Sequence, residues 1–203
     1  NTTGYSNTAV GSSALDANIT GVQNVAIGYD ALGLNTTNNN TAVGSYALRV
    51  NTSGTANAAF GYASLDANTT GVNNTAVGSD SLTASTTGGA NTAVGVNALG
   101  ANTTGGQNVA LGSSAGASLT TGTYNVLIGY NVQAAAVGAT NEIVIGNGNQ
   151  VGKGNSTGYI SPAGGPMYNG QNSTVWVVDS DRRIKKDIVP NTKGLAAINQ
   201  IEP

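Results

Sequence analysis

The segment Asn74-Thr-Ala-Val-Gly78 decides the fold, because close copies of it recur through most of the chain. Nine copies end at the glycines Gly11, Gly28, Gly44, Gly61, Gly78, Gly95, Gly112, Gly129 and Gly146. Seven of the intervals between these glycines are 17 residues and one is 16. The last copy, Asn141-Glu-Ile-Val-Ile-Gly146, contains one extra residue. A repeat held in such register indicates a regular stack of equivalent units rather than a disordered chain.

The length and pattern of the repeat predict β-structure. A period of 17 residues is too short for the helix pairs of helical solenoids, which need about 33 residues. Residues within each copy alternate in the manner of a strand, and turns such as Asn68-Thr-Thr-Gly71 follow. The sequence therefore predicts an all-β fold: a parallel β-solenoid or β-roll of about nine 17-residue coils, each with two short strands and two turns.

The alternation also predicts which side chains face the interior. We expect the fourth residue of each copy to stack inside as an apolar ladder, opposite the leucine that follows each of the first six glycines by four residues. The ladder residues are Val10, Ile27, Val43, Phe60, Val77, Val94, Leu111, Ile128 and Ile145. The small third residue then faces outward, where another copy of the chain can approach closely. The predicted trimer face consists of Ala9, Ala26, Ala42, Ala59, Ala76, Ala93 and Ala110.

Two further positions have structural interpretations. Asn7 and its equivalents are expected to stack as a ladder of amides. The glycines are expected where the chain turns with positive φ. Asparagine-linked glycosylation triplets such as Asn68-Thr-Thr70 follow from the composition alone, so they carry no weight as sugar sites.

The composition argues against most catalytic chemistry. Glycine (30 residues), asparagine (27) and threonine (25) dominate, charged residues make up only 8%, and histidine and cysteine are absent. No thiol or imidazole chemistry is therefore available, and no cofactor is expected. Four aspartates recur at matching places without the Gly-Gly-x-Gly-x-Asp pattern of calcium-binding β-rolls, so no metal site is predicted. They are Asp16, Asp30, Asp66 and Asp80.

Charge and hydropathy limit the partners. The net charge of −2 leaves no basic footprint for nucleic acid or an anionic membrane before residue 180. No apolar run approaches the roughly 20 residues of a membrane span. Asn1 begins neither a signal peptide nor a normal translation start, which predicts that the sequence belongs to a longer chain.

The chain divides into three predicted parts. Residues 1–146 form the β-solenoid domain. Residues 147–175 are rich in Gly, Asn, Ser and Pro and are predicted to form a connector. Residues 176–203 contain the single tryptophan and five of the seven basic residues, which indicates the start of a different domain.

The Asn-Thr-Ala-Val-Gly units resemble the head repeats of trimeric autotransporter adhesins, and similar units occur in phage tail fibres. This resemblance covers residues 1–146 and implies a left-handed parallel β-roll in a threefold bundle.

The segment Ser180-Asp-Arg-Arg-Ile-Lys-Lys-Asp-Ile188, with Gly194-Leu-Ala-Ala-Ile-Asn-Gln-Ile-Glu-Pro203 after it, resembles the start of another domain. This is the intramolecular chaperone domain of phage tail spikes and fibres, known from endosialidases. The resemblance implies chaperone-assisted trimerisation and self-cleavage between Ser180 and Asp181, with Ser180 as nucleophile and Lys185 as base. A lysine with a lowered pKa can deprotonate a serine. The alternative is that Ser180 caps the start of a helix.

Together these features predict a homotrimeric structural fibre of a phage tail, located in the virion. It would present or space a tip that attaches to a host receptor or glycan, and it would contact other tail proteins. The alternatives are a trimeric adhesin on a bacterial cell surface and a polysaccharide-degrading tailspike. A tailspike needs carboxylates about 5 to 10 Å apart, whereas the five acidic residues before residue 179 are scattered among different repeats. No catalysis beyond a single self-cleavage is therefore expected.

Overall fold

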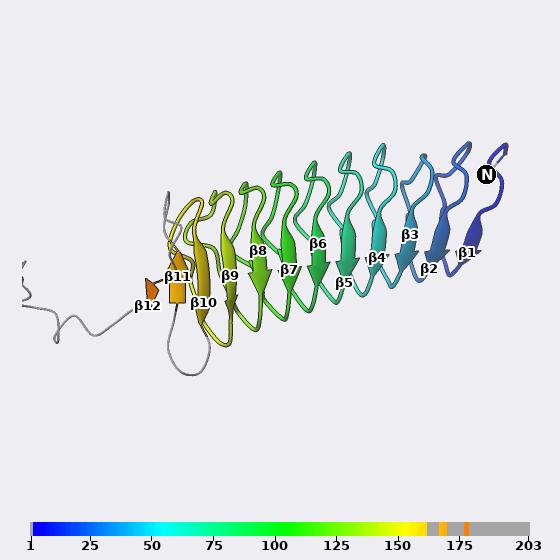
Figure 1. Ribbon diagram of the computed structural model, residues 1–203. Helices are drawn as coiled ribbons and strands as arrows, with labels where there is room; N and C mark the ends of the chain where they lie inside the picture. The colour runs from blue at the N-terminus through cyan, green and yellow to red at the C-terminus, as the bar shows by residue number, and fades with distance from the viewer. Residues whose placement is uncertain (1, 162–166, 170–176, 179–203) are drawn as a thin grey trace, which may run out of the picture.

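The computed structural model describes residues 2–161, 167–169 and 177–178, and their strands form one twelve-stranded sheet (Figure 1). The strands are β1 (Thr8–Val10), β2 (Val25–Ile27), β3 (Thr41–Val43), β4 (Ala58–Phe60), β5 (Thr75–Val77), β6 (Thr92–Val94), β7 (Val109–Leu111), β8 (Val126–Ile128), β9 (Ile143–Gly146), β10 (Gly158–Ser161), β11 (Met167–Asn169) and β12 (Val177–Val178). Strands β1 to β10 are parallel, and β11 and β12 are antiparallel to their neighbours. The described residues contain no helix.

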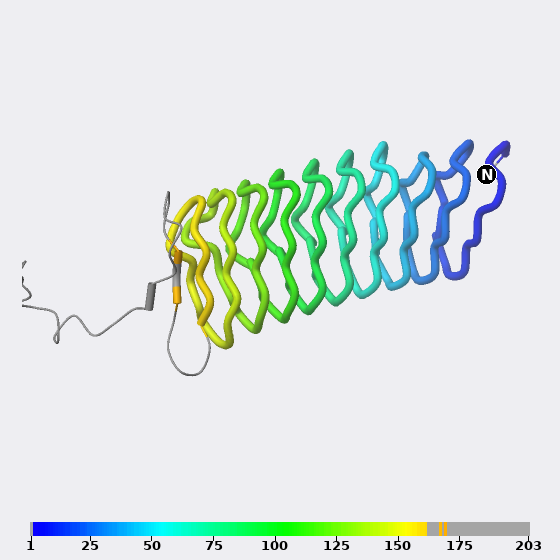
Figure 2. The backbone as a smooth tube through the Cα atoms, viewed as in Figure 1, coloured from blue at the N-terminus to red at the C-terminus, as the bar shows by residue number. Residues whose placement is uncertain are grey.

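Each coil contributes one strand, which pairs in register with the strand of the next coil. Ala76 in β5, for example, lies between Ala59 in β4 and Ala93 in β6. The backbone winds once per repeat, so that successive coils stack into a column (Figure 2). The predicted parallel β-solenoid of about nine turns is confirmed.

In the coils that the structure describes, the predicted second strand is not present, because the leucine that follows the glycine by four residues lies in a turn. Leu65 has a φ of 52°, in the left-handed region, and the equivalent Leu48 has a φ of 50°. That conformation costs a non-glycine residue roughly 1–2 kcal/mol. The turn is held by the next coil, since the Leu65 N–H donates to the Ser81 carbonyl at 3.0 Å. Complete burial of the leucine side chain offsets the strain.

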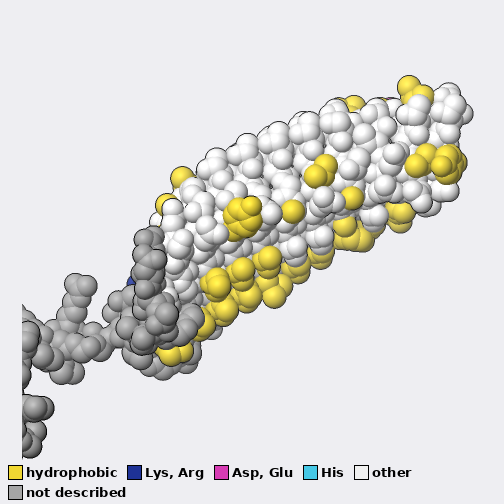
Figure 3. Space-filling model, turned by 45° about the horizontal axis from the view of Figure 1, so that its top comes forward, with side chains coloured by type: hydrophobic (Ala, Val, Ile, Leu, Met, Phe, Trp, Pro, Cys, Tyr) yellow, Lys and Arg dark blue, Asp and Glu magenta, His cyan; other side chains and the backbone are white. Residues whose placement is uncertain are grey.

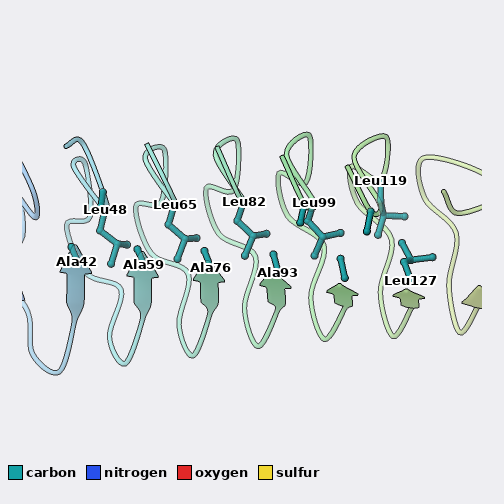
Figure 4. Close-up of a cluster of buried hydrophobic side chains, with 14 of the residues drawn as sticks. Ala42, Leu48, Ala59, Leu65, Ala76, Leu82, Ala93, Leu99, Leu119 and Leu127 are labelled. Atoms are coloured by element: carbon teal, nitrogen blue, oxygen red, sulfur yellow. The ribbon is translucent and has the colours of Figure 1, made fainter. Parts of the chain in front are cut away.

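The strand side chains point the opposite way to the prediction. The third-position alanines of β2 to β7, Ala26 to Ala110, are fully buried and lie against the leucines inside the column (Figure 4). Ala9, in the first coil, is exposed. The fourth-position residues face outward: Val10 is 57% exposed and Phe60 is 41% exposed. The predicted internal ladder is therefore on the outer face, and the predicted trimer face is inside the coil.

The narrow interior explains this reversal. Each of the first six coils places one leucine inside, and only a methyl group fits opposite it. Strand β8 instead carries a large inward residue, Leu127. The turn of the preceding coil, after β7, has Gly116 at the position that is leucine in the first six coils. A Cβ at Gly116 would lie 2.7 Å from Leu127 Cδ1 and 2.9 Å from Leu99 Cδ2. The volume of the core thus stays similar, because the large side chain comes either from the turn or from the strand, but not from both.

The glycine that closes each strand is required by the stacking of the coils. Gly78 has a φ of +131°, and a Cβ there would lie 2.5 Å from the carbonyl oxygen of Gly95 in the next coil. The Gly95 carbonyl belongs to the backbone and cannot move aside as a flexible side chain could. The positive φ predicted for the glycines is confirmed at the eight from Gly11 to Gly129.

Two ladders of buried asparagines link the coils. In the first, the Asn91 N–H donates to Asn74 Oδ1 at 3.0 Å, and Asn91 Nδ2 donates to the Gly105 carbonyl at 2.9 Å. The predicted amide ladder is confirmed for the residues Asn7, Asn24, Asn40, Asn57, Asn74, Asn91, Asn108 and Asn125. These bonds satisfy the polar groups that a narrow column cannot expose to water.

The second ladder was not predicted and is interrupted. Asn68 Nδ2 donates to Asn51 Oδ1 at 2.9 Å, which continues the series through the turns. Ser85 takes the place of the next asparagine, and its hydroxyl, Asn68 Oδ1 and both polar side-chain atoms of Asn102 lack partners within the described residues. Leu119 occupies the following position.

The column extends beyond the boundary predicted at residue 146. Strand β10 pairs in parallel with β9, with Tyr159 opposite Val144 and buried like it. Part of the predicted connector therefore belongs to the sheet. The ninth repeat also has a different alignment from the prediction: Val126 pairs with Ile143, so the residue equivalent to Asn125 is Glu142 and the repeat contains no extra residue.

Candidate functional site

The most extensive exposed feature of the column is the outer face of its sheet. We call the nine outward fourth-position side chains, from Val10 to Ile145, the apolar stripe. Phe60 is 41% exposed and Leu111 is 48% exposed, and the stripe follows the column along its length (Figure 3). Outward second-position residues widen it where they are apolar, as at Val109 and Ile143. A stripe of nine such side chains leaves on the order of 500 Å² of apolar surface, at the upper end of what a soluble monomer exposes.

One strand of the stripe, β4, combines a large outward side chain with a small one. Phe60, the largest outward residue of the stripe, shares β4 with Ala58, the smallest second-position residue among β1 to β9. The other strands from β1 to β9 carry valine, isoleucine or leucine at the fourth position and threonine, valine or isoleucine at the second, as Val77 does with Thr75. The small residue in β4 leaves room beside the large one, as expected where a surface packs against another surface, because contact requires complementary shapes.

A second exposed feature lies in the turns after β2, β3 and β4. The rings of Tyr29 and Tyr46 have centroids 5.3 Å apart at an interplanar angle of 89°, and those of Tyr46 and Tyr62 are 5.8 Å apart at 85°. Arg49 lies 5.3 Å from the centroid of the Tyr46 ring. It also forms a bidentate ion pair with Asp66, through Nε–Oδ1 at 2.8 Å and Nη2–Oδ2 at 3.0 Å. We call these five residues the tyrosine cluster.

The tyrosine cluster is polar at its edge and electrostatically balanced. The hydrogen bond from Arg49 to Asp66, followed by their charge attraction, raises the pKa of the Arg49 guanidinium above its ordinary value. Asp30 contributes more weakly in the same direction. Both partners of the ion pair remain partly exposed, so the pair contributes little to stability. It holds the two side chains in a fixed arrangement beside the tyrosines.

Glu142 closes the first asparagine ladder. Its side chain is fully buried, Oε2 accepts a hydrogen bond from the Ala135 N–H at 2.9 Å, and Oε1 accepts one from the Gly154 N–H at 2.8 Å. The longer glutamate reaches loop segments that an asparagine could not reach. Glu142 therefore links the loops that contain Ala135 and Gly154 to the column, which is a structural role.

The aspartates considered in the sequence analysis do not come together. Asp66 pairs with Arg49, and Asp80 accepts a hydrogen bond from its neighbour Ser79 at 2.8 Å. No group of three potential metal ligands occurs in the part of the chain that the structure describes. Asn68, in a glycosylation triplet, is fully buried with its amide nitrogen bonded to Asn51 and Gly71. A folded coil therefore does not present that amide to a modifying enzyme.

Ser180, Asp181 and Lys185, which the sequence singled out for self-cleavage, lie outside the described residues. Among the residues that are described, no helix is long and apolar enough to cross a membrane. The tyrosine cluster was not predicted, although the spacing of Tyr29, Tyr46 and Tyr62 by 17 and 16 residues matches the period of the coil.

Comparison with models of known protein families found no match, and comparison with curated proteins found no similar sequence. The fold alone therefore assigns the class of this chain: a parallel β-solenoid with an apolar outer sheet face.

Proposed function

We propose that this chain is the shaft of a homotrimeric phage tail fibre, a structural protein that presents or spaces a host-attachment tip. The observation that carries the proposal is the apolar stripe. Nine coils at about 4.8 Å each give a rod roughly 40 Å long, and one face of that rod carries an apolar fourth-position side chain in every strand from β1 to β9. A rod of this kind suits a mechanical role, since backbone hydrogen bonds link each coil to the next along the column.

The stripe supports association between copies of the chain. Burying about 500 Å² per chain removes apolar surface from water at roughly 25 cal/mol per Å², a gain of order 12 kcal/mol per chain before the entropy of association is subtracted. The size matching of Phe60 and Ala58 favours parallel copies in register. In that arrangement equal rungs lie at equal height, so the large residue of one chain meets the small residue of the next.

The number of three chains and the tail-fibre assignment rest on the resemblances of the sequence. The Asn-Thr-Ala-Val-Gly units resemble those of threefold bundles. The segment from Ser180 to Pro203 resembles the start of a trimerising chaperone. The second resemblance favours a tail fibre of the virion over a bacterial surface adhesin, and we extend it to self-cleavage at Ser180-Asp181 with Lys185 as base.

A pair of matched substitutions tests whether the stripe is the interface. Leu111 is 48% exposed on the stripe, and Leu34 is 50% exposed in the turns of the second coil, outside the sheet. Leu111→Asp should break the assembly, because it places three carboxylates in an apolar contact. Leu34→Asp should leave the assembly intact. Equal sedimentation of the two variants at the mass of the wild type would refute the proposed interface.

A further inference from the structure

The tyrosine cluster departs from the repeat, and that departure indicates a purpose other than stacking the coils. Features that the coil geometry demands recur in nearly every coil, as the glycines, the inner alanines and the first asparagine ladder do. Directly after the glycine, where Tyr29 and Tyr62 lie, four coils carry a serine (Ser12, Ser45, Ser79 and Ser113), and Tyr130 is the third tyrosine at this position. Arg49 is one of only two basic residues before residue 179. Contacts between aromatic rings, together with an ion pair, thus occur on three adjacent coils.

The cluster presents aromatic rings beside fixed polar groups. Tyr29 is 50% exposed and Tyr62 is 55% exposed, and they flank Tyr46 through edge-to-face contacts. Arg49 lies over the Tyr46 ring, so the rings of Tyr29 and Tyr62 are the more accessible ones. The Arg49–Asp66 pair adds hydrogen-bond donors and acceptors held in one plane.

This chemistry fits a neutral saccharide. The C–H faces of a pyranose ring are apolar and slightly positive, which matches the negative face of an aromatic ring. Sugar hydroxyls are donors and acceptors at once, and a guanidinium paired with a carboxylate satisfies both. The charge of Arg49 is already balanced by Asp66, and Asp30 adds a negative charge nearby. Anionic sugars would therefore be repelled.

We propose that the tyrosine cluster is a binding site for neutral saccharide chains, with Tyr29 and Tyr62 as the stacking platforms and Arg49–Asp66 as the hydrogen-bonding pair. The inference deepens the proposed attachment function, and it places a glycan contact on the shaft as well as at a tip. A shallow, open site binds weakly by itself. Three copies on one fibre raise the effective affinity by avidity.

The chain contains a matched control for the test. Tyr130 directly follows its glycine, as Tyr29 and Tyr62 do, and is 61% exposed. It lies four coils beyond Tyr62, roughly 19 Å along the column. Tyr130→Ala therefore removes an equivalent exposed ring without touching the cluster.

The experiment applies the 203-residue chain to immobilised neutral oligosaccharides of glucose, galactose, mannose and N-acetylglucosamine, with sialylated and sulfated oligosaccharides alongside. We expect binding to at least one neutral oligosaccharide, a loss of about tenfold or more for Tyr62→Ala and Arg49→Gln, and wild-type binding for Tyr130→Ala. Thermal melts confirm that each variant is folded.

Three results would overturn the site: no binding to any neutral oligosaccharide, binding confined to anionic ones, or equal loss in Tyr130→Ala. A change in the sedimenting mass of Tyr62→Ala would also overturn it, because the cluster would then belong to the contact between chains. The trimer proposal is tested separately by the mass of the wild-type chain, so the two proposals can fail independently.

Discussion

The large side chain of the core comes from the turn in the first six coils and from the strand at Leu127. Substitutions of Gly116 and Leu127 should therefore have strongly coupled effects on the free energy of unfolding. Leu127→Ala alone should leave a cavity inside the column and cost about 3 kcal/mol of the free energy of unfolding. Gly116→Leu alone should overpack the core by about 2 kcal/mol, because its Cβ would lie 2.7 Å from Leu127 Cδ1. The backbone itself accepts leucine, since Gly116 has a φ of 63° and Leu99, in the equivalent position, has a φ of 51°.

The double variant restores the alanine–leucine arrangement of the first six coils. Its cost should be about 1 kcal/mol rather than the roughly 5 kcal/mol of the two single changes together, a coupling of about 4 kcal/mol. Guanidinium chloride unfolding followed by circular dichroism measures this, at one fixed chain concentration so that assembly contributes equally to all four proteins. A double variant whose cost equals the sum of the single costs would refute the volume-exchange argument.

Three other changes test separate features. Ser85→Asn should fill the gap in the second asparagine ladder, give Asn68 Oδ1 a donor, and raise the free energy of unfolding by about 1–2 kcal/mol; an unchanged or lower value in the same unfolding assay would show that the gap is not a defect. Gly78→Ala should prevent stacking, whereas Gly154→Ala should cost only the strain of its φ of +116°, because no atom lies within 4 Å of the added Cβ; equal melting temperatures would contradict this. In the full-length protein, Ser180→Ala and Lys185→Arg should each leave one uncut chain by mass spectrometry, since arginine stays protonated and cannot act as base; an uncut wild-type chain would make Ser180 a cap or turn residue.

The period of the sequence was sufficient to predict the solenoid, because backbone hydrogen bonding between equivalent coils requires equal numbers of residues per turn. The direction of the side chains was not predictable from alternation alone. Alternation states that Ala76 and Val77 face opposite sides, but the side that faces inward depends on the width of the coil. Leu82, held in a left-handed turn, fills that width and leaves room only for a methyl group.

The ninth repeat shows a related limit of pattern reasoning. Asn141 matches the asparagine of the other copies by residue type, whereas Glu142 holds that position by hydrogen bonding. A carboxylate that accepts two backbone N–H groups can replace an amide at the end of a ladder. The equivalence of Glu142 to the ladder asparagines becomes visible only in the structure, where the loops at Ala135 and Gly154 donate those hydrogen bonds.

The tyrosine cluster depends on contacts between coils, which residue periodicity suggests but does not establish. Tyr46 lies one residue further from its glycine than Tyr29 and Tyr62 do, so alignment of the repeats places it in a different column. The rings meet because the turns bring the two positions together at 5.3 and 5.8 Å.

Sedimentation equilibrium of the wild-type chain tests whether the chain is a homotrimeric fibre shaft, because the apolar stripe has to be covered in such a shaft. The chain has a mass of 20.0 kDa. We expect a single species of about 60 kDa at micromolar concentration, since burying the stripe removes about 500 Å² of apolar surface per chain from water. A folded species at the mass of one chain, stable with its stripe exposed to water, would contradict it.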